Sequence, residues 1–361
     1  MTESDEFRHI ITSEVVINMN QKYLIPLTTV FLLFVVAYAG VEGAGLHGFF
    51  GIVIPYLAVL AFLAGFVYKV LGWASSAVPF RIPTTCGQQK TLPWIKQNSI
   101  DNPDTSAGVI VRMFLEIFLF RSLFRNTKAA FSRNESNKLS YSWEIFLWLG
   151  ALAFHYAFLT VLIRHLRFFT APVPQCVQFL EYLDGIVQLG LPGLFLSGVV
   201  LLGAVLFLLA RRLFDAKVTY ISQAADYFPL FLIIGIALSG IFMRYFTKVD
   251  IIGIKTLTMG LVTFSPTIPE GVGGLFYAHL FLVSILFAYF PASKLMHMGG
   301  IFLSPTRNMA STNRAKRHVN PWNYDVTTHT YEQYEDHFRE KMIEAGLPVV
   351  KQPVDKTDEK E

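Results

Sequence analysis

Residues 274–300 read GLFYAHLFLVSILFAYFPASKLMHMGG, an apolar run long enough to cross a membrane, with a histidine near each end. The two histidines, His279 and His297, are 18 residues apart. At about 100° per residue, that spacing returns to the same side of an α-helix after about five turns. The pattern therefore predicts one membrane helix with both imidazoles on one face.

A second apolar run, residues 143–169, carries His155 and His165, which are ten residues apart. Their directions differ by roughly 80° around a helix, so both lie on one broad face. Ionisable side chains inside a bilayer are costly and are functional candidates by default. Two histidines on each of two membrane helices are typical of a protein that binds two cofactors, one above the other. We therefore predict that the four histidines are the axial ligands of two b-type haems.

The order of the apolar runs predicts how the histidines pair. Three crossings separate the two runs, so the helices are antiparallel. His155 and His297 then bind the inner haem iron, nearer the cytoplasm, and His165 and His279 bind the outer haem iron. The helical rise separates the ligands by about 15 Å on one helix and about 27 Å on the other. A bend near Pro291 is expected to absorb the difference.

The composition is that of a membrane protein, because 53% of the 361 residues are hydrophobic and only 16% are charged. Four more segments are long enough to span a bilayer: about 23–40, 49–73, 189–210 and 227–245. We predict an all-α membrane protein with six transmembrane helices, a haem-binding helix bundle, a cytoplasmic loop and a C-terminal tail. The first twenty residues lack a signal-peptide pattern, so the first apolar segment is expected to remain as an anchor.

The two cysteines, Cys86 and Cys176, stand alone, so the sequence has neither a CxxC metal site nor a CxxCH haem attachment. Any haem is therefore held by coordination. Bis-histidine ligation leaves no open iron position, which suits electron transfer. The net charge of +4 carries no basic, aromatic-rich patch that would indicate nucleic acid.

Composition divides the chain into five regions. They are a cytoplasmic N-terminal segment (1–22), two spans (23–73), a basic cytoplasmic loop (74–142), a four-helix dihaem core (143–298) and a cytoplasmic tail for partner docking (299–361). Lysine and arginine gather in the N-terminal segment, the loop and the tail. By the positive-inside rule, the chain is a multi-pass protein of a prokaryotic cytoplasmic membrane with both termini in the cytoplasm.

The loop contains an apolar stretch, residues 109–124, that is interrupted by Arg112, Glu116 and Arg121. A spanning helix would bury these charges at a cost of a few kcal/mol each, so an interfacial helix is favoured.

In the tail, Thr330 and Gln333 predict a helix N-cap and Gly346 predicts its end. Four residues form an apolar stripe along this helix: Tyr331, Tyr334, Phe338 and Met342. The stripe packs either on the chain's own loop or on a partner, and the sequence leaves both interpretations open.

A quinol site needs an apolar slot beside the outer haem with a few polar groups that accept protons. The region after His165 offers three candidates, which can also be ordinary solvated side chains: Arg167, Glu181 and Asp184. Arg164 and Lys294 lie beside haem ligands and can pair with haem propionates or anchor the helices at the interface. Glu42 and His47 lie in a glycine-rich turn. They can be ordinary residues of the turn or a pair that transfers protons, and the sequence leaves both interpretations open.

The histidine spacings resemble those of the dihaem cytochrome b (gamma) subunits of respiratory nitrate reductases. The tail is more specific. Residues 294–324, KLMHMGGIFLSPTRNMASTNRAKRHVNPWNY, resemble the DsrM family of membrane cytochrome b subunits, which belong to the DsrMKJOP complexes that accompany dissimilatory sulfite reductase. The resemblance covers roughly two-thirds of the chain.

This resemblance implies a quinol oxidoreductase subunit with two haem b groups, exchanging electrons between menaquinol or menaquinone and a cytoplasmic iron–sulfur subunit. That partner would carry heterodisulfide-reductase-like domains, as DsrK-type subunits do, and would serve sulfite reduction. Other membrane and extracytoplasmic subunits are expected in the same complex. Nitrate reductase gamma subunits have five spans, so the additional N-terminal span and residues 74–142 lie outside their pattern.

Two other functions remain open. A transporter or channel can use intramembrane histidines as a proton relay, which predicts a water-lined path and no visible spectrum. A structural anchor for a redox partner predicts that all four histidines can be replaced without loss of electron flow.

Overall fold

The computed structural model of the protein describes residues 3–76, 87–132, 138–185, 193–314 and 327–351. Cys86, the first residues of the predicted fourth span and residues 315–324 of the DsrM-like stretch lie outside the described residues. The chain divides into two compact units, Met1–Ala315 and Lys316–Glu361.

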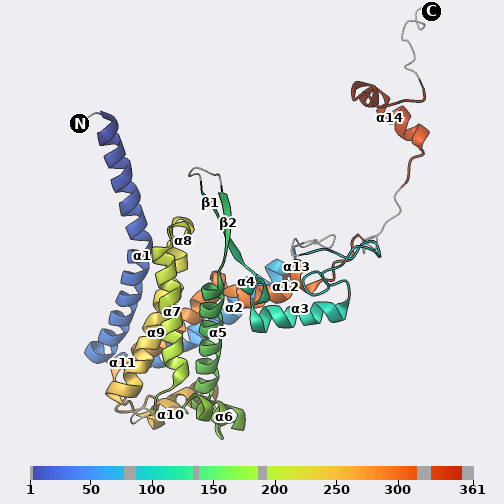
Figure 1. Cartoon of the computed structure of the whole chain (residues 1–361). Helices are drawn as coiled ribbons and strands as arrows, with labels where there is room; N and C mark the ends of the chain where they lie inside the picture. Colours follow the sequence, from blue (N-terminus) through green and yellow to red (C-terminus); the bar gives the residue numbers. More distant parts are fainter. Residues whose placement is uncertain (1–2, 77–86, 133–137, 186–192, 315–326, 352–361) are drawn as a thin grey trace, which may run out of the picture. The chain divides into compact units, whose positions relative to one another are not determined.

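Six helices are long and apolar enough to span a membrane, which confirms the predicted fold class. The first two spans are Gln21–Ala44, in α1 (Glu3–Ala44), and Phe49–Ala74, made of η1 (Phe49–Val53) and α2 (Ile54–Ala74). The third is Ile145–Phe168, made of α5 (Ile145–His165) and η2 (Leu166–Phe168), and the fourth is α7 (Leu196–Phe214). The fifth is Ala224–Thr247, made of α9 (Ala224–Phe242) and η3 (Met243–Thr247), and the sixth is Gly274–Ala292, made of α11 (Gly274–Tyr289) and η4 (Phe290–Ala292). Figure 1 shows α1, α5, α7 and α9 packed side by side. Since α1 continues without a break through residue 22, the polar N-terminal segment joins the first span as one helix.

The packing centres on α11, which contacts α1, α2 and α9. Tyr277, Ala278 and Leu282 of α11 are fully buried. One hydrophobic cluster joins α11 to α1 and α10 (Ile251–Val262), and a second joins it to α7 and α9. The helix that bears His279 is therefore held on several sides.

The prediction of one continuous helix over residues 274–300 is wrong. α11 ends at Tyr289, and the 3₁₀ turn η4 contains Pro291, which has no N–H to continue the helix. Ser293 is extended, η5 (Lys294–Met296) follows, and His297 begins the separate helix α12 (His297–Leu303). The rise of a continuous helix therefore does not set the separation of His279 and His297.

The two ends of the bundle differ. One end carries α8 (Ala216–Ile221) and a hairpin of β1 (Thr127–Ser132) and β2 (Lys138–Trp143), which the sequence did not predict. We call it the hairpin end. The opposite end carries α6 (Gln175–Asp184) and α10, as Figure 1 shows. Because α5 starts beside the hairpin, His155 lies nearer the hairpin end and His165 nearer the opposite end.

The predicted loop helix is two helices, α3 (Ser106–Leu119) and α4 (Arg121–Phe124), separated by Phe120. At 14 residues, α3 is shorter than a span. Its charged residues Arg112 and Glu116 are buried, while Ile110 and Phe114 are exposed. Glu116 accepts a bond from Arg307 of α13 (Pro305–Asn308) at 2.8 Å. The loop is thereby fastened to the chain that follows α12.

In the second unit, α14 (Tyr331–Glu344) begins with the predicted capping box of Thr330 and Gln333. Gly346, with φ of +68°, follows its end, as predicted. Met342 is buried, whereas the aromatic residues of the predicted stripe are exposed within this unit.

Candidate haem and quinol sites

All four predicted haem ligands use Nδ1 in a hydrogen bond. In His155, His165 and His297, Nδ1 lies 2.7–2.8 Å from a backbone carbonyl three or four residues earlier. Because a carbonyl can only accept, Nδ1 of each ring carries the proton, and Nε2 is left as a lone-pair ligand. This outward support of an imidazole is typical of metal-bound histidine.

His279 is supported differently, by a side chain from a neighbouring span. Its Nδ1 lies 2.8 Å from Oγ of Ser239 on α9. Ser239 Oγ also lies 2.7 Å from the carbonyl oxygen of Gly235, so the hydroxyl donates to that carbonyl and accepts from His279. The next residue, Gly240, leaves room for the ring, since a Cβ there would lie 3.3 Å from His279 Cε1. Nε2 of His279 is therefore also left to bind a metal.

Two of the predicted ligands approach one another, as their predicted pairing requires. The ring centres of His155 and His297 are 5.9 Å apart, with planes at 80°. A metal–imidazole bond of about 2 Å on each side of one metal places ring centres roughly 6 Å apart, so this pair fits a shared iron. His155, His165 and His297 are exposed on the polypeptide surface, where a bound cofactor would shield them from lipid.

The pair of His155 and His297 is bordered by Phe120, whose ring centre lies 4.9 Å from that of His155. Phe120 has a φ of +48°, which is unusual for a bulky residue. Its conformation is held from both sides, because its N–H donates to Leu115 and the Tyr156 hydroxyl donates to the carbonyl of Phe118 at 2.9 Å. The end of α3 is thus tied to α5 beside the predicted inner ligands.

The buried Asp184 forms an ion pair with the partly buried Arg164 at 2.5 Å. Asp184 also accepts from the N–H and the hydroxyl of Ser197, each at 2.6 Å. Arg164 lies over the ring of Phe195 at 3.4 Å. These contacts join α5, α6 and the start of α7. Asp184 therefore holds three helices together. The carboxylate that pairs with Arg164 in this structure is Asp184, whereas the sequence suggested a haem propionate as a partner.

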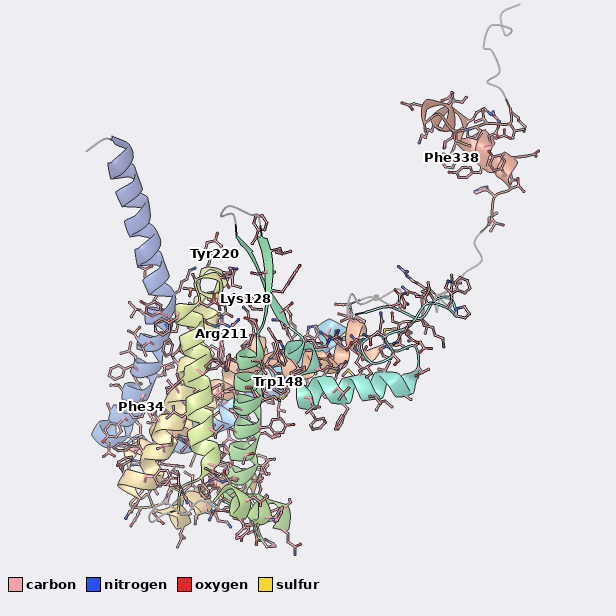
Figure 2. The ribbon with its side chains drawn as sticks, in the orientation of Figure 1. Phe34, Lys128, Trp148, Arg211, Tyr220 and Phe338 are labelled. Atoms are coloured by element: carbon pink, nitrogen blue, oxygen red, sulfur yellow. The ribbon has the colours of Figure 1, made fainter. Side chains whose placement is uncertain are left out.

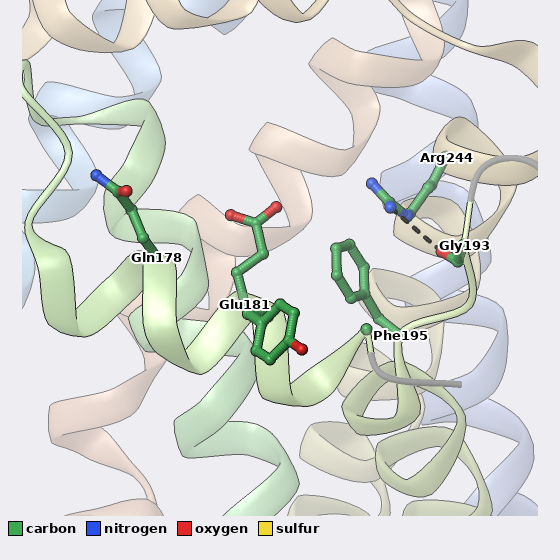
Figure 3. Close-up of a pocket in the computed structure, with 7 residues that line it drawn as sticks. Gln178, Glu181, Gly193, Phe195 and Arg244 are labelled. Atoms are coloured by element: carbon green, nitrogen blue, oxygen red, sulfur yellow. Dashed lines mark hydrogen bonds between the residues drawn. The ribbon is translucent and has the colours of Figure 1, made fainter. Parts of the chain in front are cut away.

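A cavity of about 460 Å³ lies at the end opposite the hairpin. Its lining comprises Gln178, Glu181, Tyr182, Gly185, Gly193, Phe195 and Arg244. Figure 3 shows Glu181 and Arg244 on either side of Phe195. Arg244 donates to the Gly193 carbonyl at 3.3 Å and stacks on Phe195 at 3.8 Å.

One of the three predicted quinol-site residues, Glu181, lines this cavity. It is paired with Arg167, which follows His165 by two residues. Asp184 is not part of the lining. Arg244 is, and sequence reasoning missed it, because a single arginine near the end of a span looks like an interface anchor.

The remaining candidates have protein partners. Lys294 pairs with Asp226 of α9 at 2.6 Å. Glu42 accepts from the N–H of Gly274 at 2.6 Å and so caps α11, and the ring of His47 stacks edge-on against Tyr277. Within the described ranges, no group of three or more histidine, cysteine or acidic residues could hold a metal ion, and Cys176 is an exposed thiol.

Comparison with known proteins identifies the family. Two curated relatives are both named "Hdr-like menaquinol oxidoreductase cytochrome b-like subunit". The protein of Archaeoglobus fulgidus is 44% identical over 280 residues, covering 76% of this chain and 83% of the relative. That of Archaeoglobus profundus is 44% identical over 276 residues, covering 74% and 81%. Residues 110–312, which contain all four histidines but neither α1 nor α2, match the nitrate reductase gamma subunit family. The chain therefore belongs to the nitrate reductase gamma subunit family.

Proposed function

We propose that this chain is the dihaem cytochrome b subunit of a membrane menaquinol oxidoreductase. The observation that carries the proposal is the set of four histidines on the third and sixth apolar runs, all of which have Nδ1 engaged and two of which, His155 and His297, have ring centres 5.9 Å apart. The names of the two Archaeoglobus relatives support both the menaquinol and the cytochrome b parts of the proposal.

In this proposal, His155 and His297 hold the inner haem b, and His165 and His279 hold the outer one. When bound, the haems would carry electrons one at a time across the membrane. The chain itself fixes each ligand ring, through three backbone carbonyls and the Ser239 hydroxyl. We infer that the hairpin end faces the cytoplasm, and the basic loops support this through the positive-inside rule.

The cavity around Glu181 is the proposed menaquinol site. Phe195 and Tyr182 provide apolar walls, and Arg244 provides a donor for a quinone oxygen. Glu181 is the proton acceptor, and its partner Arg167 connects the cavity with the neighbourhood of His165. Asp184 does not serve here, because its oxygens already bind Arg164 and Ser197.

The proposed electron partner is a cytoplasmic iron–sulfur subunit with heterodisulfide-reductase-like domains, as in DsrK-type proteins. The "Hdr-like" name of the relatives supports it. The likeness of residues 294–324 to DsrM subunits supports a role in dissimilatory sulfite reduction.

The test is a reduced-minus-oxidised visible spectrum of the detergent-purified protein, with haem quantified as its pyridine complex. We expect two haems b in the wild type and one in each single histidine variant. His155→Ala and His297→Ala should lose the same haem, and His165→Ala and His279→Ala the other. His337→Ala, in α14, is the control and should keep both. A wild type without haem would overturn the proposal, and loss of the same haem in His155→Ala and His279→Ala would overturn the pairing.

The menaquinol site is tested by stopped-flow reduction of the haems with a soluble menaquinol analogue. Glu181→Gln should slow reduction by roughly 100-fold at full haem content, because a proton acceptor is lost. Glu270→Gln removes an exposed carboxylate outside the cavity and should reduce at the wild-type rate. Equal rates in the two variants would exclude Glu181 as the acceptor.

A further inference from the structure

The hairpin at the end of the bundle has one apolar and one polar face. Directly opposed residues of an antiparallel pair share a face, and faces alternate along each strand. The apolar face carries the pairs Phe131–Leu139, Ala129–Tyr141 and Thr127–Trp143, and the polar face carries Lys128–Ser142. We call Phe131, Leu139 and Tyr141 the hairpin face. Their side chains are 61%, 51% and 67% exposed.

The polar face is held by the protein itself. Lys128 Nζ bonds to Asp215 at the α7–α8 corner at 2.6 Å, and Arg211 bonds to Glu144 at the base of the hairpin at 3.1 Å. Figure 2 shows Lys128 and Arg211 at this junction. The hydrogen bond from Lys128 holds the pKa of Asp215 below its usual value. These contacts orient the hairpin, and the hairpin face is on its other side.

An exposed apolar face on a two-stranded hairpin indicates that something covers it. Such a hairpin is marginally stable alone and normally packs against another layer. Lipid is a poor cover, because both strands are edges whose unpaired N–H and C=O groups would be unsatisfied in hydrocarbon. A protein surface, which can satisfy those groups, fits the hairpin face better.

The position of the hairpin indicates which kind of protein would cover the hairpin face. β2 is joined to α5 through Glu144 alone, and α5 carries His155. At the hairpin base, the Trp143 ring packs on Phe124 with centres 4.9 Å apart. Phe124 ends α4, the short helix that follows Phe120, and the Phe120 ring contacts His155. A protein docked on the hairpin face would therefore lie next to the structure around the predicted inner haem ligands.

We propose that the hairpin face is the docking surface for the iron–sulfur protein that exchanges electrons with the inner haem. This inference rests on the proposed function. It follows because electrons at the inner haem need an acceptor, and the described residues hold no cluster of metal ligands. The charged side chains around the hairpin are largely neutralised in ion pairs, Arg125 with Asp101, Lys128 with Asp215, Arg211 with Glu144 and Arg212 with Asp226. The attraction for the iron–sulfur protein should therefore come mainly from the apolar side chains of the hairpin face.

The test compares two identical substitutions at the same end of the molecule. Tyr141→Ser alters the hairpin face, whereas Tyr220→Ser removes an 81% exposed tyrosine on α8, beyond the polar face. The haems are reduced with a menaquinol analogue, and their reoxidation by the purified iron–sulfur protein with heterodisulfide-reductase-like domains, from the same cells, is followed. Tyr141→Ser should slow reoxidation at least about tenfold, as loss of an interface aromatic does, and Tyr220→Ser less than about twofold.

Two further measurements make the outcome decisive. Phe131→Ser should reproduce the defect, and it replaces Tyr141→Ser if that variant loses haem. A photo-crosslinking residue at position 141 in intact cells should form an adduct with the iron–sulfur protein. An adduct with a second copy or with lipid would overturn the docking surface. Reoxidation at the wild-type rate in both Tyr141→Ser and Phe131→Ser would also overturn it. Absence of haem, or of its reduction by menaquinol, would instead overturn the proposed function.

Discussion

Ser239 on α9 and His279 on α11 are linked by a 2.8 Å contact between Oγ and Nδ1. In the other three histidines, Nδ1 donates to a backbone carbonyl three or four residues earlier in the same segment. Among the four, His279 is therefore the one whose ring is oriented by a neighbouring span. Ser239 is thus a positioning residue for the proposed outer haem ligand.

Ser239→Ala should raise the midpoint potential of the outer haem by roughly 20–60 mV and leave the inner haem unchanged. The reason is that a bonded Nδ1–H makes the imidazole a stronger donor, and one hydrogen bond contributes about 1 kcal/mol. A redox titration of the visible spectrum measures both potentials. Ser239→Thr keeps the hydroxyl and should behave as wild type. Ser284→Ala, which removes a buried hydroxyl bonded only to the Leu280 carbonyl, is the control. A shift of both haems would contradict this role.

Gly65→Ala should impair the inner haem selectively. A Cβ at Gly65 of α2 would lie 2.7 Å from Pro291 Cβ, so the break that precedes His297 must move. Overpacking of this kind costs about 1–3 kcal/mol. Haem quantitation should show partial loss of the inner haem with the outer one retained. Gly72→Ala lies on the same helix with nothing within 4 Å and should keep both. Equal haem contents in the two variants would show that the break tolerates the added methyl.

Asp184→Ala should destabilise the protein by about 3 kcal/mol, because it leaves the partly buried Arg164 guanidinium without its carboxylate. Thermal unfolding in detergent should show a lower midpoint, and Asp184→Ala with Arg164→Leu should recover part of the loss. Haem that remains bound should still be reduced by menaquinol. Normal stability with no menaquinol reduction would instead make Asp184 the proton acceptor.

The C-terminal unit should loosen in acid through Glu335 of α14. The N–H groups of Lys351 and Val350 donate to this carboxylate at 2.8 Å, which holds its pKa below the usual value. With the folded pKa lowered, this stabilisation is present above the unfolded pKa of about 4.3 and is lost as pH falls through the folded pKa. The protection of the Val350 and Lys351 amides against hydrogen exchange, relative to the intrinsic rate at each pH, should fall over that range in the full-length protein. Glu335→Gln should remove the acid dependence, and unchanged dependence in that variant would exclude Glu335 as its source.

Much of this arrangement was predictable from local pattern. Apolar length predicts the six spans, because the bilayer demands about 20 apolar residues for each crossing. Antiparallel order then predicts which histidines approach, and the contact of His155 with His297 agrees. The capping box at Thr330 was equally readable, since all its atoms lie within one turn of chain.

Features that depend on distant residues were not predictable. The hairpin is anchored by Lys128 to Asp215, 87 residues away, and its apolar face does not form a long run. Pro291 predicted a bend in the sixth span, but the histidine spacing suggested that the helix continued beyond it, and the restart of the chain as a separate helix at His297 was not predicted. The partners of Arg164 and Lys294 likewise lie on other helices, so their charges alone indicated cofactor contacts and interface anchoring equally well.

The extended residue Ser293 has a consequence for how this protein tolerates changes in length. An inserted residue between His155 and His165 would turn one imidazole by about 100° relative to the other, because α5 is unbroken between them. No such obligatory rotation applies between His279 and His297, where the helix stops and restarts around Ser293. An inserted residue between the ligands of the third span should therefore turn one imidazole away from its partner, whereas one at Ser293 changes the position of His297 without a fixed change in its direction.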